Sequence, residues 1–152
     1  GMAWENKLYR FPYVDRGDGD RIERRFADLA KGGTIETNDH VKRIQDFLAD
    51  QGYAQNLGDV SHPLYDNPVV AQAHDCLFTY SSCDWMMTSR HKGKQIYQTP
   101  DDLVAALDAD PWLQQDDWDH IILMHDEAEI HDVTLHLIAA MVARNFKFME
   151  RF

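Results

Sequence analysis

Residues 76–89 read CLFTYSSCDWMMTS, and this stretch decides the fold class. It is rich in aromatic residues, threonine and cysteine, and its apolar positions do not recur with a helical period, which favours β-structure. Residues 92–94 (Lys-Gly-Lys) are typical of a turn, so we expect a β-hairpin within 76–98. We expect a further strand over 118–125 and a closing strand over 146–149.

Helical patterns occur on both sides of this stretch. Apolar residues recur every three or four positions after capping residues, and these patterns predict helices over 20–31, 37–51, 69–75, 100–109 and 132–144. Thr99 and Pro100 give the clearest start, a cap followed by a first-turn proline, and Asp132 is expected to cap the last helix. The sequence therefore predicts an α+β fold: N-terminal helices packed on a small, mainly antiparallel sheet with a buried C-terminal helix.

Length and composition are those of one soluble domain. The chain has 152 residues and 44% hydrophobic content, so we expect residues 1–152 to form a single globular domain, with Gly1 added before Met2 by cloning. Two cysteines, Cys76 and Cys83, are too few for a disulfide framework; we expect unbonded thiols and a cytoplasmic location. Apolar runs are too short for a membrane span, and the acidic balance does not suit nucleic acid.

The negative charge is concentrated in one part of the chain. The formal net charge is −11, and no lysine or arginine occurs between Lys94 and Arg144. That interval holds nine aspartates, two glutamates and four of the histidines. A concentrated negative field attracts a cation, which can be a metal ion, a basic partner protein or a protonated imidazole.

The main interpretation is a protein-binding module. Small acidic inhibitor or immunity-type proteins neutralise basic enzymes by letting charge steer association while aromatic side chains supply affinity. We expect the acidic surface of residues 101–132 to bind a basic protein in this way, without a cofactor. The candidate partner-binding residues are Asp116, Asp117, Asp119, Asp126, Glu127 and Glu129.

The alternative interpretation is a metal-dependent hydrolase. Imidazole and carboxylate groups are ligands for zinc, manganese and iron. The order of His40, the His74-Asp75 pair and then Asp126 or Asp132 resembles that of the all-helical HD superfamily of metal-dependent phosphohydrolases. The resemblance implies a divalent metal that activates water against a phosphate ester. The candidate metal ligands are His74, Asp75, His125, Asp126 and His131.

Nucleophilic catalysis by a cysteine is not expected. Cys83 is followed directly by Asp84, and a neighbouring negative charge disfavours the thiolate that would be the nucleophile.

Overall fold

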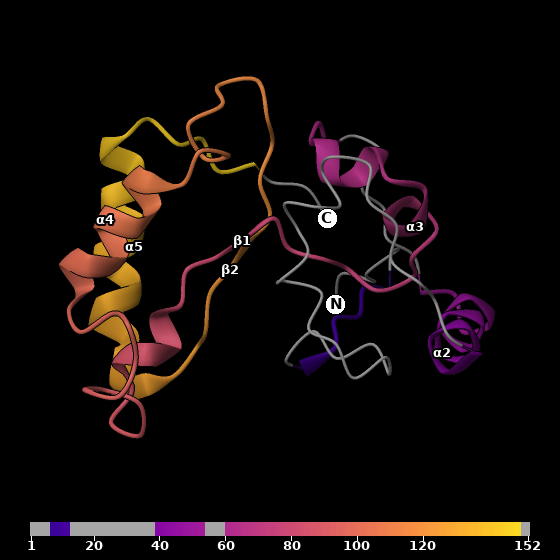
Figure 1. The fold of residues 1–152 in the computed structure, drawn as a ribbon, viewed down its shortest axis with the longest axis horizontal. Helices are drawn as coiled ribbons and strands as arrows, with labels where there is room; N and C mark the ends of the chain where they lie inside the picture. Colours follow the sequence, from indigo (N-terminus) through magenta and orange to yellow (C-terminus); the bar gives the residue numbers. More distant parts are fainter. Residues whose placement is uncertain (1–6, 13–38, 54–59, 150–152) are drawn as a thin grey trace, which may run out of the picture. The chain divides into compact units, whose positions relative to one another are not determined.

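A computed structural model describes residues 7–12, 39–53 and 60–149 (Figure 1). By their contacts the residues divide into two compact units, with the boundary between Thr79 and Tyr80. We call them the first and the second unit and describe each by itself. The expected helix over 20–31 lies outside the described residues, and the single domain stays a prediction.

The first unit contains the expected second helix, α2 (Asp39–Asp50). Val41 and Leu48, two turns apart, are buried on one face. The helix ends because Gly52 takes a positive φ of 75°, which a residue without Cβ adopts readily, and the amide of Tyr53 returns to the carbonyl of Leu48 at 2.9 Å.

The rest of the first unit is built from short segments. A 3₁₀-helix, η3 (Pro63–Asp66), precedes α3 (Pro68–Ala71), which is shorter than the helix expected over 69–75. Fully buried Leu64, Val70 and Leu77 belong to the apolar core.

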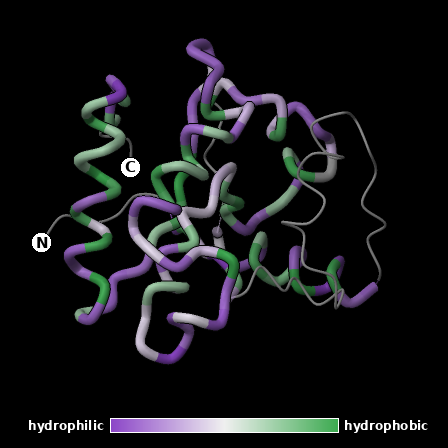
Figure 2. The backbone as a smooth tube through the Cα atoms, turned by 60° about the vertical axis from the view of Figure 1, so that its left-hand side comes forward, coloured by the Kyte–Doolittle hydropathy of each residue, from purple (hydrophilic) through white to green (hydrophobic). Residues whose placement is uncertain are grey.

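The second unit runs in the order β1 (Tyr80–Ser81), η4 (Asp84–Met87), α4 (Pro100–Ala109), β2 (Ile122–Leu123), η5 (Ala128–Ile130) and α5 (His131–Ala143). The helix α4 has the expected bounds, and α5 is one residue from its expected place at each end. Helices together with a small sheet make the described chain α+β, as predicted. In Figure 2, apolar residues (green) recur along the helices between polar ones (purple).

The expected hairpin and the expected antiparallel sheet are wrong. The strand β1 pairs with β2 in parallel, Tyr80 with Ile122 and Ser81 with Leu123. Residues 84–87, before the expected turn, form η4, and residues 95–97, after it, form no strand. Parallel strands need a crossover connection, and α4 lies in the segment that links these two.

Two further local expectations are wrong. Residues 146–149 form no strand: Asn145 has a φ of 63°, and the amide of Phe146 donates to the carbonyl of Met141, so the chain turns at the end of α5. Ile130, not Asp132, occupies the N-cap of α5, because η5 leads directly into the helix and places Asp132 in its first turn.

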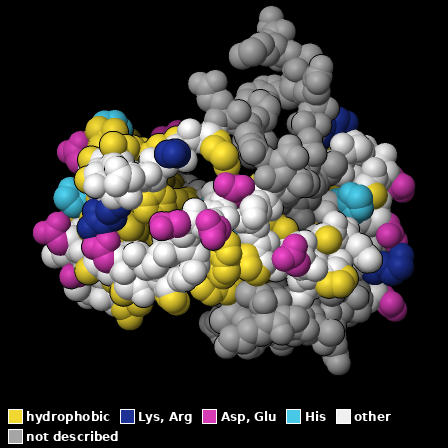
Figure 3. Space-filling model, turned by 90° about the horizontal axis from the view of Figure 1, so that it is seen from above, with side chains coloured by type: hydrophobic (Ala, Val, Ile, Leu, Met, Phe, Trp, Pro, Cys, Tyr) yellow, Lys and Arg dark blue, Asp and Glu magenta, His cyan; other side chains and the backbone are white. Residues whose placement is uncertain are grey.

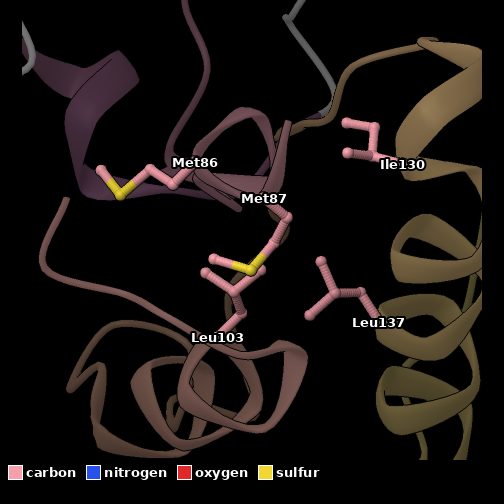
Figure 4. Packing of buried hydrophobic residues seen from close by; sticks show 5 residues of the cluster. All are labelled: Met86, Met87, Leu103, Ile130 and Leu137. Carbon is pink, nitrogen blue, oxygen red and sulfur yellow. The ribbon is translucent and has the colours of Figure 1, made fainter. Parts of the chain in front are cut away.

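The core of the second unit lies between η4, α4, η5 and α5. Its main cluster comprises Met86, Met87, Leu103, Ile130 and Leu137 (Figure 4). A second cluster joins Leu107, Leu113 and Met141. Thus α5 buries one row of side chains, while Leu135 and Val142 on its other faces are exposed.

The helices α4 and α5 run in the same direction. Near the start of α4, Asp101 pairs with His136 at 3.2 Å, and near its end Asp108 pairs with Arg144. From the first pair to the second, the residue number rises in both helices, so the helices are parallel. Their C-terminal ends therefore lie at the same end of the second unit. The turns after α4 and the residues before α5 therefore lie at opposite ends, as Figure 1 shows.

Candidate functional site

Several carboxylates of the acidic interval are used to hold the fold together. Asp102 accepts hydrogen bonds from the amides of Gln98 at 2.8 Å and Thr99 at 2.9 Å, and the Thr99 hydroxyl accepts from the Asp102 amide in return. This reciprocal capping satisfies amides at the start of α4 that have no partner within the helix. These hydrogen bonds lower the pKa of Asp102, and the one from the Gln98 amide has the largest effect.

Asp108 and Asp110 are engaged at the other end of α4. Asp108 forms two hydrogen bonds with the Arg144 guanidinium, and these lower the pKa of that carboxyl. Asp110 accepts from the amides of Trp112 at 2.8 Å and Leu113 at 3.1 Å, which fixes the turn after the helix.

The six candidate partner-binding residues fall into two groups. Asp116, Asp117 and Asp119 follow α4, and Asp126, Glu127 and Glu129 precede α5, so the structure does not bring all six to one place. Glu129 accepts a hydrogen bond from the Ser89 amide at 2.8 Å, which lowers its pKa, and Asp119 is only partly exposed.

Four of the six candidate carboxylates are exposed, and the structure gives them no hydrogen bond or ion pair with any described residue: Asp116, Asp117, Asp126 and Glu127. Figure 3 views the molecule from the end at which α4 finishes. In its left-hand part, carboxylates (magenta) and apolar side chains (yellow) lie next to each other on the same face, with Lys or Arg (dark blue) and His (cyan) side chains among them. An acidic surface mixed with apolar atoms is a chemistry suited to a basic protein partner.

The segment after α4 also carries two tryptophans. The rings of Trp112 and Trp118 lie with their centroids 6.2 Å apart and their planes at 83°, an edge-to-face pair. Both side chains are partly exposed. His120, two residues further on, is half-buried, and burial lowers its pKa, so the ring is neutral at pH 7 and adds no positive charge here.

A completely buried carboxylate in the second unit belongs to a residue that sequence reasoning did not select. Asp84 is completely buried, and its carboxylate accepts from the His125 amide at 2.8 Å and from the Trp85 amide at 3.0 Å. Its Oδ1 also lies 2.7 Å from Nδ1 of the His125 ring. One signal was available: Asp84 is the only charged residue in the apolar stretch 76–89, and a lone buried carboxylate needs hydrogen-bond partners.

The contact with Asp84 orients the His125 ring. A carboxylate at Nδ1 favours the tautomer that carries the proton there, leaving Nε2 as an acceptor for a proton or a cation. The ring is 32% exposed, and the structure gives its Nε2 no partner among the described residues. Cys83, although next to Asp84, packs against the methionine-rich core cluster, and its Sγ donates to Ser81 Oγ at 3.7 Å. Among the described residues, the geometry therefore gives an oriented imidazole but no hydrogen bond from its ring to a nucleophilic side chain.

The candidate metal ligands do not form a metal site in the described part of the chain. His74 and Asp75 belong to the first unit, where the His74 ring contacts the Tyr53 carbonyl at 3.1 Å and Asp75 accepts from Gln45 at 2.8 Å. In the second unit, His131 pairs with the adjacent Asp132. Among the residues that the structure describes, no three histidine, cysteine or acidic side chains come together in a group that could hold a metal ion.

Comparisons with protein-family models, with curated proteins and with solved structures find no match to this chain. Within the described ranges, no helix has the length and apolar character that crossing a membrane requires.

Proposed function

We propose that this chain is a protein-binding module that recognises a basic partner protein with the end of the second unit formed by residues 112–119. One observation carries this proposal: Asp116 and Asp117 are exposed and engaged by no described residue, in an interval without lysine or arginine. Their charges are therefore available to a cation from outside.

At the opposite end of the second unit, the exposed carboxylates before α5 are explained by the helix that follows them. Glu127 is the N-cap of η5, which leads directly into α5, and Asp126 lies beside it, so this negative charge is placed before a helical N-terminus, the end that favours it. Asp116 and Asp117 come after the end of α4, where negative charge gives no such benefit. Their charge is therefore better explained by an external partner than by stability.

Unbalanced surface charge of this kind acts mainly on the rate of association. A negative surface steers a basic partner over distances up to about a Debye length, roughly 8 Å at physiological salt. The thiols Cys76 and Cys83, which are not joined in a disulfide, support the accompanying proposal of a cytoplasmic location. No observation in the described residues favours the metal-dependent hydrolase, so we do not propose it.

The test is a stopped-flow measurement of association with a basic probe protein, such as cytochrome c, at several salt concentrations. The double variant Asp116→Asn/Asp117→Asn should reduce the association rate several-fold at low salt and flatten its salt dependence. The matched control, Asp126→Asn/Glu127→Gln, removes the same charge from the other end of the unit and should have a smaller effect. Equal effects of both double variants, or no association of the parent protein at low salt, would contradict the proposal.

A further inference from the structure

We infer that the right-angled pair of Trp112 and Trp118 anchors this surface by holding one arginine side chain of the basic partner. The inference rests on the proposed function and adds the chemistry of the contact. Its occupant is a guanidinium group that sits against the indole rings and pairs with the carboxylates of Asp116 and Asp117.

The ring geometry is the first support. The two planes meet at 83° with centroids 6.2 Å apart, so the pair presents ring surfaces in two directions within a small space. A cation is attracted to an aromatic face within about 6 Å of the ring centroid, and tryptophan is the strongest ring for this contact. Both tryptophans are partly exposed, so a partner can reach this pair from solvent.

The turn that carries the tryptophans is held by the protein itself. The Asp110 carboxylate fixes the Trp112 amide at 2.8 Å, the Gln115 amide donates to the Trp112 carbonyl at 3.1 Å, and the Trp118 amide donates to the Gln115 carbonyl at 3.3 Å. A turn fixed before binding loses less conformational entropy when a partner arrives. The tryptophans are thus presented on an ordered segment.

Charge complementarity identifies the occupant as cationic. Asp116 and Asp117 lie between the two tryptophans in sequence and are exposed, without a described partner. Of the nearby basic groups, Arg144 is engaged by Asp108, burial keeps His120 neutral, and the exposed Lys147 after α5 forms no ion pair with either carboxylate in the described part of the chain.

Arginine fits this combination better than lysine. Its guanidinium is planar, so it stacks on an aromatic face while its N–H groups donate to a carboxylate at its edge. A lysine ammonium is a compact and strongly hydrated charge that cannot do both in one plane. Tryptophan and arginine are also the residues that contribute most to the affinity of protein interfaces.

The test is an NMR titration of the ¹⁵N-labelled full chain with three short peptides that differ only at one position: arginine, lysine or citrulline. Citrulline has the shape of arginine but no charge. We expect the arginine peptide to shift the indole N–H signals of Trp112 and Trp118 and to leave that of Trp85 unchanged. We expect the lysine peptide to bind several-fold more weakly and the citrulline peptide to give no saturable shift. Equal binding of citrulline and arginine would overturn the inference.

Two variants separate this inference from the proposed function. Trp118→Leu keeps an apolar side chain but removes a ring, and should weaken the arginine peptide roughly tenfold. The same variant should leave the early, salt-dependent association with cytochrome c largely unchanged. Trp118→Phe, which keeps a ring and serves as the control for folding, should recover much of the peptide affinity. If Trp118→Leu binds the arginine peptide as well as the parent does, the anchor is refuted while the charged surface stands. If Asp116→Asn/Asp117→Asn leaves both probes unaffected, both proposals fail.

Discussion

Replacing Asp84 with alanine should destabilise the second unit more than any change to an exposed carboxylate. The Asp84 side chain is fully buried and accepts three hydrogen bonds: two from His125, at 2.7 and 2.8 Å, and one from the Trp85 amide at 3.0 Å. Alanine removes the acceptor for all three and leaves a cavity between η4 and the segment after β2. The donors then lose their partners in a place where water enters poorly.

The magnitude follows from the burial of the two partners. Alanine leaves three donors without the ionised acceptor, and a hydrogen bond to a charged group contributes about 1.5–3 kcal/mol. The His125 ring is 32% exposed, so water compensates part of the loss, and we expect a total of about 3 kcal/mol. Asp84→Asn, which keeps one acceptor oxygen, should lose roughly half as much, because a neutral hydrogen bond is about half as strong as a charged one.

Urea denaturation followed by far-UV circular dichroism measures this directly. With a denaturant dependence of about 1–3 kcal/mol per molar urea, a loss of about 3 kcal/mol moves the midpoint by roughly 1–3 M. Asp117→Ala is the matched control, since an exposed carboxylate without a partner should change stability by no more than about 0.5 kcal/mol. If Asp84→Ala and Asp117→Ala unfold within about 1 kcal/mol of each other, the contact with His125 contributes little and the reasoning fails.

Two other measurements test the remaining structural assignments. Hydrogen bonds lower the pKa of Asp102, Asp108 and Glu129 in the folded protein, so their contribution to stability is fully present above the pKa of the unfolded chain, about 4, and is lost as the pH falls through the lower folded-state values. The urea midpoint should therefore decrease below about pH 4, and a midpoint that stays constant in this range would contradict these contacts. Burial raises the pKa of the Cys76 thiol, so Cys76 should react slowly with iodoacetamide at neutral pH in the folded protein. After denaturation without reductant, Cys76 and Cys83 should both titrate as thiols, and the absence of reactive thiols would refute this.

The sequence predicted well the elements whose signals are local. The bounds of α4 follow from Thr99, Pro100 and the acids of the first turn, because capping depends only on residues within one turn. The end of α2 at Gly52 is equally local. Each of these signals involves neighbours in the chain, so no knowledge of the fold is needed to use it.

The pairing of the strands depends on contacts that local patterns do not contain. Tyr80 and Ile122 are partners although they are far apart in sequence, and each strand is only two residues long. A short aromatic stretch fits a hairpin as well as it fits a parallel strand, since both need the same side chains on a pleated surface. The turn signal at Gly93 was real, with a φ of 79°, but it belongs to a loop that leads to α4.

For the candidate site, which stays a prediction, only the exposure of the selected residues can be compared with the structure. The exposed Asp116 and Asp117 were selected from charge alone, and the structure leaves them exposed. Charge alone does not distinguish them from Glu129, whose partner is an amide 40 residues away. It also gave no weight to Asp84, because a single acid contributes little to a charge pattern. Asp84 is completely buried, and a buried carboxylate needs hydrogen-bond donors from the protein.

The short parallel pairing of β1 with β2 has a consequence for the order in which the second unit folds. Residues within α4 find their partners within one turn, whereas the Asp84–His125 contact closes a loop of 41 residues. Because closing a long loop costs entropy before any contact is gained, α4 should form early and the pairing of the two strands late. The late step also brings His125 to the Asp84 carboxylate, so a strand pairing shifted by one residue would leave a buried charge without its partner. A single acid thus makes the final step of folding selective for one register.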